Sequence, residues 1–510
     1  MHALKVTRAE DFPEWYQAVV READLAENSP TRGSMIIKAW GMGLWELIQG
    51  ELDRRIKETG HDNYYFPLLI PLSFFAKEAE HVEGFAKEMA VVTHHRLKTI
   101  DGELKPDPEA ELTEPLIIRP TSETIIGDAF SRWIKSYRDL PFKLNQWANV
   151  MRWEMRTRLF LRTAEFLWQE GHTAHADEAD AMEETMLALE LYRALAEDFL
   201  AIPVIVGEKP ENERFPGAVR TYSIEAMMQD GKALQAGTSH YLGTNFAEAQ
   251  NIRFQDKDGG VSLAHTTSWG MTTRMIGATV MVHGDDDGLR TPPAAAPRQI
   301  VIVPMLRGKP EDADLMAYCQ TLATELNAGA AFGKPIRAFV DTKDARPADK
   351  RWDWVRRGAP IICEIGPRDA ANGQVTFIKR NALREGEKIK SHTLAHSEFV
   401  SRASALLETA QRELFVEAKA RTDENIRGGF ESFADLEQYY GAGENESEFK
   451  GWARVHWSRP TGAALEQVGE RLKALKLTIR NAPLNQPASF GKCMFTGQPG
   501  VEEILIARAY

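Results

Sequence analysis

An arginine-rich hairpin between residues 152 and 172 constrains this chain more than any other feature. Arg152-Trp-Glu154 ends one strand-like run, and Glu165-Phe-Leu-Trp-Gln-Glu-Gly-His172 forms the next. The turn between them carries Arg156, Arg158 and Arg162. Guanidinium groups bind phosphate oxygens through paired hydrogen bonds, and a carboxylate can accept a hydrogen bond from an exocyclic amine. Surface arginines on a solvated ribbon would explain one of these residues but not all, so the hairpin indicates a site for a nucleoside triphosphate.

Length and composition set the broad class of the protein. A chain of 510 residues is longer than a single hydrophobic core supports, so we expect about two to four domains. No stretch reaches the ~18 consecutive apolar residues of a membrane span, and the first residues lack a signal-peptide core. We therefore expect a soluble, cytoplasmic protein without membrane segments. Three widely spaced cysteines, Cys319, Cys363 and Cys493, supply neither a disulfide framework nor a complete metal site.

The charge distribution favours one localised polyanionic partner. A net charge of −12 argues against a protein that coats nucleic acid through bulk electrostatics. Between Arg337 and Lys390, however, 13 Lys or Arg residues stand against 8 Asp or Glu residues. A basic segment in an acidic chain fits a partner bound at one place, although ordinary charge scatter would give the same count.

Residues 1–287 are expected to form an α+β domain with an antiparallel sheet. Helical spacing near the start alternates with short aromatic strand-like runs at 64–70, 115–118 and 251–254. Short strands grouped around intervening helices favour this class over a parallel α/β series. The segment Asp285–Pro297 then reads as a linker, with 288–297 as its core, because prolines continue neither a helix nor a strand ladder.

The remaining residues are expected to form two further domains. Buried-type strands alternate with helices over 298–405, which predicts a compact α/β domain. A long charged helix over about 397–421 leads into a C-terminal domain, 406–510, whose weak pattern we interpret as a small α+β unit.

Three stretches resemble, in order, the signature motifs of class II aminoacyl-tRNA synthetases. Gly60-His-Asp-Asn-Tyr-Tyr-Phe-Pro67 is similar to motif 1, the helix–strand element of the dimer interface. The hairpin from Arg152 through Glu170 is similar to motif 2, and Trp269-Gly-Met-Thr-Thr-Arg274 is similar to motif 3. The resemblance implies a class II catalytic domain and a homodimer formed through the motif 1 region.

Further segments resemble one family within this class, the prolyl-tRNA synthetases. They are Arg119-Pro-Thr-Ser-Glu-Thr124, Phe160–His172, Gln235-Ala-Gly-Thr-Ser-His-Tyr-Leu-Gly243 and Glu364-Ile-Gly-Pro-Arg-Asp369. Only 94 residues separate His172 from Thr267, which leaves no room for the editing domain of the bacterial form. The chain therefore resembles the archaeal and eukaryotic-style branch. That resemblance implies activation of L-proline by ATP to prolyl-adenylate and pyrophosphate, followed by transfer of the prolyl group to the 3′ end of tRNA(Pro).

The resemblance also assigns nucleotide-binding residues. Arg152 and Arg274 are the expected catalytic residues, because activation depends on aligning the reactants and neutralising charge in a polyanionic transition state. Magnesium ions bridging the phosphates would complete this neutralisation. The residues expected to bind ATP are Arg152, Glu154, Arg162, Phe166, Gln235, Thr238, Thr272 and Arg274.

A pocket for proline should offer an anion to the secondary ammonium and apolar surface to the ring. By resemblance, the proline-binding residues are Thr121, Glu123, Arg152, Trp168, Glu170, His172, Thr238, His240 and Gly270. Several of these have plainer interpretations. Glu123 fits a helix N-terminus after Thr121 and Ser122, Trp168 fits a hydrophobic core, and the two histidines fit core positions with satisfied hydrogen bonds.

The predicted α/β domain resembles the family's anticodon-binding domain, which implies contacts from Glu364, Arg368 and Asp369 to tRNA bases. Family members usually carry arginine two residues before that glutamate, where this chain has Ile362. We expect Arg356 or Arg357 to compensate for its absence.

The C-terminal domain of this branch often binds zinc through four cysteines. Here Cys493-Met-Phe-Thr496-Gly497 retains one of the last pair, and the region around Trp457 lacks the others. One thiolate cannot form a structural zinc site, so we expect no bound metal in the protein itself and no zinc. The terminal Tyr510 resembles the family ending, in which the tail folds against the catalytic domain.

Two alternatives remain at this point. A threonyl or histidyl synthetase would share the class motifs, but the Thr121–Glu123 and Trp168–His172 signatures and the absence of cysteine from the pocket segments disfavour a threonyl enzyme, whose site uses zinc. A catalytically inactive, synthetase-like tRNA-binding protein would normally have lost its phosphate-binding arginines, whereas Arg152, Arg162 and Arg274 are all present.

Overall fold

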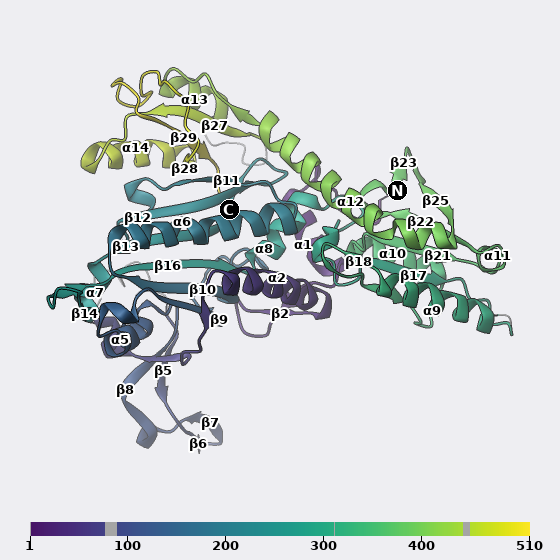
Figure 1. Ribbon diagram of the computed structural model, residues 1–510, viewed down its shortest axis with the longest axis horizontal. Helices are drawn as coiled ribbons and strands as arrows, with labels where there is room; N and C mark the ends of the chain where they lie inside the picture. Colours follow the sequence, from purple (N-terminus) through teal and green to yellow (C-terminus); the bar gives the residue numbers. More distant parts are fainter. Residues whose placement is uncertain (1, 77–88, 311, 442–448) are drawn as a thin grey trace.

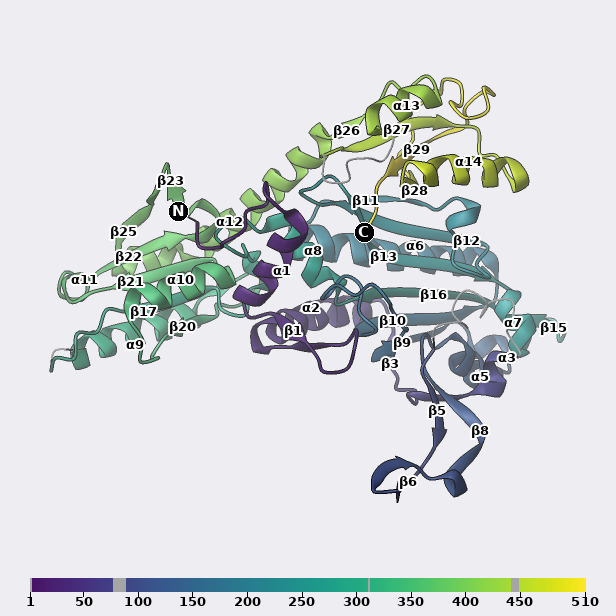
Figure 2. The same ribbon diagram turned by 180° about the vertical axis from the view of Figure 1, so that it is seen from behind.

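A single sheet joins the N-terminal and C-terminal parts of the molecule (Figures 1 and 2). The computed structural model describes residues 2–76, 89–310, 312–441 and 449–510. In order across the sheet, its strands are β26 (Ile426–Arg427), β27 (Trp452–Trp457), β29 (Glu502–Ala507), β28 (Thr478–Pro483), β11 (Ile205–Glu208), β12 (Arg220–Met227), β13 (Ala233–Gly243), β16 (His265–Thr272), β10 (Glu165–His175), β9 (Phe142–Met151) and β3 (Asp62–Asn63). The strands from β11 to β9 are antiparallel, as predicted for an α+β domain.

The two faces of this sheet carry different residues because side chains alternate along a strand. On β10, Gln169 faces helix α6 (Glu178–Ala194), where its Oε1 accepts a hydrogen bond of 2.5 Å from Tyr192. Helix α6 contacts β10, β13 and β16, and Figure 1 shows it lying across these strands. The even-numbered residues of β10, from Phe166 to His172, therefore face the opposite side.

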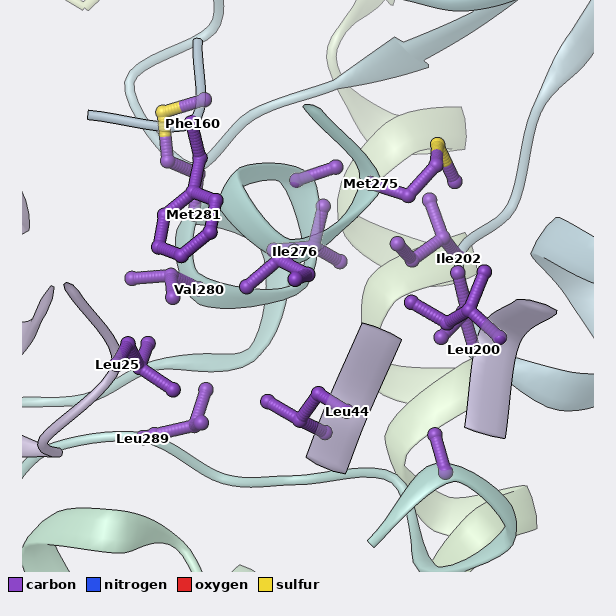
Figure 3. Packing of buried hydrophobic residues seen from close by; sticks show 14 of the residues in the cluster. Leu25, Leu44, Phe160, Leu200, Ile202, Met275, Ile276, Val280, Met281 and Leu289 are labelled. Atoms are coloured by element: carbon purple, nitrogen blue, oxygen red, sulfur yellow. The ribbon is translucent and has the colours of Figure 1, made fainter. Parts of the chain in front are cut away.

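A hydrophobic core surrounds helix α8 (Arg274–His283), which is buried along most of its length. Figure 3 shows Ile276, Val280 and Met281 of α8 among side chains from several distant segments. These include Leu44 of helix α2 (Ala39–Glu58) and Phe160 of the arginine-rich hairpin. The hairpin is thus anchored to the same core as the helix that follows motif 3.

The remaining elements of the N-terminal part surround this core and sheet. An arm built from β4, β5 and β8 ends in the β6–β7 hairpin and projects away from the sheet (Figure 1). The elements are α1 (Phe12–Glu22), β1 (Ala26–Asn28), β2 (Met35–Ile37), β4 (Leu69–Pro71), α3 (Leu72–Ala76), β5 (Val91–His94), β6 (Leu97–Ile100), β7 (Glu103–Pro106), β8 (Glu111–Ile118), α5 (Glu123–Trp133), α7 (Asn245–Gln250), β14 (Arg253–Gln255) and β15 (Val261–Leu263).

The strand expected over 64–70 is wrong. Two short strands, β3 and β4, flank an irregular segment that contains Pro67. Proline lacks the N–H that a central strand needs, so the ladder stops before it and resumes after it. Helix α2 still leads directly into β3, which preserves the expected helix–strand order of motif 1.

The segment expected to be a linker is folded into the interior. Leu289, Thr291 and Ala294–Ala296 are buried, and Pro293–Ala295 form a short 3₁₀ turn. Prolines interrupt regular structure here as predicted, but apolar side chains give the segment a place in the core.

Three consecutive aspartates just before this segment fasten distant parts of the chain together. Asp285 pairs with Arg380 at 2.6 and 2.7 Å, and Asp287 pairs with Arg384 at 2.8 Å. Asp286 accepts from Arg8 at 3.1 Å. Two arginines of the basic segment 337–390 are therefore used for internal ion pairs.

Residues after the buried segment form the predicted α/β domain. Its strands, in sheet order, are β20 (Ala338–Val340), β17 (Ile300–Pro304), β21 (Ile361–Ile365), β22 (Gln374–Lys379) and β25 (Ser391–Ala395). Strand β17 is parallel to both of its neighbours, β20 and β21. Helices α9 (Asp312–Ala328) and α12 (His396–Glu424) cover one face, and α10 (Pro347–Arg357) covers the other.

Helix α12 continues from this domain into the C-terminal part (Figure 2), so the expected boundary at 405/406 falls within a helix. Beyond it, helices α13 (Phe433–Tyr440) and α14 (Gly462–Ala474) share a core with β27, β28 and β29. This is the expected small α+β unit. Its strand β28 pairs with β11 and thereby extends the main sheet.

The C-terminal tail folds back onto the N-terminal part, as expected from Tyr510. The Tyr510 hydroxyl donates to Asp230 at 2.5 Å, and its backbone N–H donates to the Ala233 carbonyl at 3.1 Å. The ring centre lies 5.7 Å from the guanidinium carbon of Arg158 in the arginine-rich hairpin. Among the residues that the structure describes, no helix combines the length and apolar character needed to cross a membrane.

Gly171 should not tolerate a side chain. A Cβ atom there would lie 2.1 Å from Cε2 of Trp269, its cross-strand partner, which is itself buried in the core. We expect Gly171→Ala to destabilise the protein by about 1–3 kcal/mol through overpacking, seen as a lower thermal midpoint in calorimetry. Gly428→Ala is the matched control, since a Cβ at Gly428 meets no atom within 4 Å. Equal thermal midpoints for the two variants would contradict the Gly171–Trp269 packing.

Candidate active site

A cavity of about 490 Å³ collects all the residues expected to bind ATP or proline. Its walls come from strands, helix starts and loops that are far apart in the sequence. The cavity side chains alternate along β10 as Phe166, Trp168, Glu170 and His172. Strands β13 and β16, which follow β10 in the same sheet, add further residues, while the starts of α5 and α8 add one charged side chain each, Glu123 and Arg274.

The turn of the arginine-rich hairpin is held from three sides. Phe160 is buried at a positive φ of 61°, a conformation that a bulky residue adopts only when its surroundings require it. The Tyr16 hydroxyl donates to the Leu159 carbonyl at 2.7 Å, and Ala164 N–H donates to the Gly33 carbonyl at 2.7 Å. The turn therefore presents its arginines from a fixed backbone.

Arg152 lies between the aromatic wall and the backbone of the loop before α5. Its Nε donates to the Pro120 carbonyl at 2.9 Å, and its guanidinium carbon lies 5.4 Å from the Trp168 ring centre. Desolvation lowers the pKa of Arg152, while the carboxylates of Glu123 and Glu170 oppose this shift. Arginine remains protonated in either case, so the cavity holds a desolvated cation suited to an anionic group.

Arg274 forms a second cationic point at the start of α8. Its Nη1 donates to the Gln235 carbonyl at 3.3 Å, and its backbone N–H donates to the Thr272 hydroxyl at 3.0 Å. Desolvation and the nearby charge of Arg152 lower the pKa of Arg274 to about 10. Two neighbouring arginines repel one another, so an anion between them would relieve an existing electrostatic cost.

Glu154 and Arg162 pair with each other across the hairpin. Arg162 Nε and Nη2 lie 3.0 and 2.9 Å from Glu154 Oε2. The Arg162 side chain is about half exposed, so this pair contributes little to stability. Both groups line the cavity, and a nucleotide that binds there would compete with the pair.

A hydrogen-bonded network surrounds the buried Glu170 carboxylate. Its Oε1 accepts from Ser122 at 2.6 Å and from Gln146 at 2.7 Å, and Oε2 lies 3.0 Å from His172 Nε2. Burial alone would raise the pKa of Glu170, but His172, Ser122 and Gln146 bring it below its ordinary value. The Oε1 of Gln146 also accepts from Phe66 N–H at 2.6 Å, which links the motif 1 segment to this carboxylate.

The pKa values of the two cavity histidines are shifted in opposite directions. Burial disfavours the charge of His172, but its hydrogen bond to Glu170 raises the pKa above 6.5. Burial and the neighbouring His172 lower the pKa of His240 to about 3, so His240 is neutral at physiological pH. His240 stacks on Phe215 with ring centres 4.6 Å apart.

Two cavity residues also have the simpler structural roles that the sequence suggested for them. Glu123 lies in the first turn of α5 and accepts from Thr121, as a helix N-terminal carboxylate would, yet it also lines the cavity. Trp168 is buried and contributes its face to the wall. The buried Trp168 Nε1 and Ser268 Oγ have no hydrogen-bond partner among the described residues, which is consistent with a ligand that supplies one.

Comparisons with known proteins agree with this geometry. A model of the class II tRNA synthetase core domain (G, H, P, S and T) matches residues 107–283, and an anticodon-binding domain model matches 299–405. A proline–tRNA ligase from Sphingopyxis alaskensis is 62% identical over all of this chain and 96% of the relative. The chain belongs to the proline–tRNA ligase family. A family member from Protochlamydia amoebophila is 53% identical over all of this chain and 98% of the relative.

Solved structures of the family share the whole fold. The prolyl-tRNA synthetase of Cryptosporidium parvum, crystallised with L-proline and AMP, matches with a TM-score of 0.87 and 32% identity. The match covers all of this chain and 97% of that protein. A second crystal structure of the same enzyme, with halofuginone and AMPPNP, gives a TM-score of 0.88.

One wall of the cavity was not anticipated from the sequence. Glu213, Arg214 and Phe215 line it from the loop between β11 and β12. Trp153 of the hairpin and Thr221 of β12 are two further cavity residues that were not anticipated. The loop contains two prolines and a glycine around these residues, which is typical of a connection. The sequence signal that could have indicated this wall is Arg214 next to Phe215 within such a loop.

The residues expected to contact the anticodon lie in the α/β domain. Glu364 lies in β21, one residue before its end, while Arg368 and Asp369 lie in the short helix α11 (Pro367–Ala371). Asp369 is engaged within this turn, where it accepts from Gly366 N–H at 2.9 Å and from Thr376 at 2.8 Å.

The expected compensation for Ile362 is wrong. Arg356 pairs with Asp353, and Arg357 lies 3.2 Å from Asp24, so both turn away from Glu364. Arg351, one helical turn earlier on α10, reaches Glu364 at 3.2 Å. Ile362 itself is fully buried beneath α10, because alternate residues of β21 pack against this helix.

Cys493 is buried beside two hydroxyl residues. The hydroxyl oxygens of Ser458 and Thr496 lie 2.9 Å apart. Burial would raise the pKa of the Cys493 thiol, but hydrogen bonding with these hydroxyls lowers it below its ordinary value. The described part of the chain holds no group of three or more His, Cys, Asp or Glu residues arranged for a metal ion. The absence of zinc stays a prediction.

Substitutions of the two cavity histidines should show opposite pH dependences. Because the folded pKa of His172 exceeds 6.5, this residue stabilises the fold below that pH and loses the effect as the pH rises. Native His240 stays neutral, whereas the unfolded chain binds a proton below 6.5, so His240 weakens the fold as the pH falls. The loss of thermal midpoint in His172→Gln, relative to wild type, should be larger at about pH 6 than at about pH 8.

His240→Gln is the matched control, and its loss of thermal midpoint should be smaller at the lower pH. Parallel pH dependences in the two variants would contradict the charge states assigned to these histidines.

Proposed function

We propose that this chain activates L-proline with ATP and transfers the prolyl group to tRNA(Pro). The observation that carries the proposal is a single cavity with a carboxylate–histidine network at one end and converging arginines at the other. Full-length identity to proline–tRNA ligases supports the same reaction.

Proline binds at the Glu170 end of the cavity. The secondary ammonium needs a buried anion, and Glu170 and Glu123 both face the cavity as carboxylates. Trp168 lends apolar surface to the ring, with Thr121, Thr238 and Gly270 beside it. Neutral His240 adds no competing positive charge, and the hydrogen bond between His172 and Glu170 holds the Glu170 carboxylate in position.

ATP binds along the arginine end. Phe166 stacks on adenine and Glu154 accepts from its exocyclic amine, with Gln235, Thr238 and Thr272 lining the site. The pair between Glu154 and Arg162 opens when the nucleotide enters, which frees Arg162 for the outer phosphates. Magnesium arrives with ATP, since the ion is commonly held by substrate phosphates, water and one or two carboxylates.

In the activation step, a proline carboxylate oxygen attacks the α-phosphorus and the bond to pyrophosphate breaks. The step needs alignment and charge neutralisation more than acid–base catalysis. Arg152 contacts the α-phosphate and the proline carboxylate from its fixed place against Trp168. Arg274 stabilises the charge that develops on the departing pyrophosphate.

In the transfer step, a hydroxyl of the terminal adenosine of tRNA attacks the prolyl carbonyl, and AMP leaves. Glu364, Arg368 and Asp369 contact anticodon bases, with Arg351 orienting Glu364.

Glu364→Ala should lower the charging of tRNA(Pro) without changing proline activation. Unchanged charging by this variant would contradict the anticodon assignment.

The wider organisation follows the family. We propose a catalytic domain over 1–287, a connection over 288–297, an anticodon-binding domain over 298–405 and a C-terminal domain over 406–510. We also propose a homodimer formed through the motif 1 region, and a cytoplasmic location because ATP and tRNA are cytoplasmic substrates. A monomer in sedimentation measurements would contradict the dimer.

The test of the proposed function is proline-dependent exchange of pyrophosphate into ATP. Exchange with proline should exceed that with threonine, histidine, alanine or cysteine. Arg152→Ala should reduce it by about 10²–10³-fold, the usual cost of losing one charge-stabilising donor. Arg156→Ala is the matched control, because Arg156 is exposed in the same turn and does not line the cavity. A folded protein without exchange for any amino acid would favour an inactive tRNA-binding protein.

A further inference from the structure

A buried ionic group lies where the C-terminal part joins the main sheet. Arg480 of β28 donates to Glu225 Oε2 from Nε at 3.1 Å and from Nη2 at 2.8 Å. Lys209 Nζ lies 2.9 Å from the other carboxylate oxygen, Oε1. The exposed fractions are 0% for Glu225, 3% for Lys209 and 6% for Arg480. None of these three residues has a role in the reaction described above.

The Glu225 carboxylate belongs to β12, the strand paired with β13 at the nucleotide end of the cavity. Glu225 of β12 pairs with Gln235 of β13, and a β-bulge between Ile224 and Glu225 adjoins this pair. Gln235 lines the cavity, and its carbonyl accepts the hydrogen bond from Arg274. Glu225 is therefore one residue removed from a proposed ATP contact, and its charge opposes the desolvation that lowers the pKa of Arg274.

Stability alone is a poor explanation for this group. Desolvating charges in the interior costs free energy that the resulting ion pair often fails to recover. Its geometric effect is larger, because a forked guanidinium with two donors on one carboxylate oxygen fixes that carboxylate in place. The backbone pairing of β28 with β11, and the hydrogen bond from Asn481 to the Ile205 carbonyl at 3.1 Å, hold Arg480 in register.

We propose that Arg480 is a positioning residue for ATP in the activation step. It holds Glu225 beside the Gln235–Arg274 contact, so the C-terminal domain completes the nucleotide end of the catalytic cavity. This inference rests on the role proposed above for Arg274. The proline end contains Glu170 of β10, Glu123 of α5, Thr238 of β13 and Gly270 of β16. Arg480 hydrogen-bonds Glu225 and Thr478 instead, so we expect proline binding not to depend on it.

Pyrophosphate exchange with the full-length protein tests this directly. Arg480→Met keeps the apolar stem and removes the charge. Its KM for ATP should rise by about 10-fold while its KM for proline stays within about 2-fold of wild type. Arg480→Lys keeps the charge without the fork, and its KM for ATP should lie between those of wild type and Arg480→Met. This split between the two substrates would not arise from a general loss of stability.

Arg459→Met is the matched control. Arg459 lies at the same junction and pairs with Glu502 at 2.7 Å, but its side chain is about half exposed. Both KM values should stay at the wild-type level in this variant.

Several results would overturn the inference. Arg480→Met could fold and leave the KM for ATP unchanged, or raise both KM values equally. If Arg480→Met fails to fold, Arg480→Lys decides, and an unchanged KM for ATP in that variant overturns the inference.

Arg274→Ala separates the inference from the proposed function. If Arg274→Ala raises the KM for ATP and the Arg480 variants do not, only the inference fails. If Arg274→Ala leaves the KM for ATP unchanged, the ATP role proposed for Arg274 fails as well.

Discussion

The antiparallel pairing of β10 with β9 on one side and β16 on the other determines the rest of the active site. It aligns Glu170 with Gln146 of β9 and with Gly270 of β16. Because side chains alternate along a strand, a shift of one residue would turn Glu170 and its cavity neighbours toward α6. Close packing of Gly171 against Trp269 on the α6 face opposes such a shift. The same pairing therefore builds the sheet and sets the proline end of the cavity.

Buried ion pairs connect separate parts of this molecule. Asp285 joins the buried connection to Arg380 of the anticodon-binding domain, and Glu225 joins the main sheet to Arg480 of the C-terminal domain. Such pairs fix orientation even where their net contribution to stability is small. Parts that composition separates into domains are consequently held in fixed relative positions, and charge acting across a junction can influence the cavity.

The sequence was most informative where one physical rule operated locally. Family motifs identified Phe166, Trp168, Glu170 and His172 as site residues, and alternation along β10 explains why the structure puts all four on one face. It was least informative where distant packing decides the outcome. Prolines marked 288–297 as irregular, but nothing local showed that this segment is buried. Neither the pairing of Arg351 with Glu364 nor the approach of the 209–219 loop to the cavity follows from spacing, because both depend on how separate elements meet in space.

Joint binding of proline and nucleotide in one cavity is most directly tested with a stable mimic of prolyl-adenylate, in which a sulfamoyl group replaces the phosphate. Its affinity can be measured by titration calorimetry beside those of proline, AMP and the threonyl counterpart. We predict that the prolyl mimic binds at least ~10²-fold more tightly than proline or AMP alone, because one rigid cavity then contacts both halves at once. Glu170→Gln should weaken binding of the prolyl mimic but not of AMP. A prolyl mimic that binds no more tightly than AMP, or no better than the threonyl mimic, would contradict a shared proline and nucleotide site.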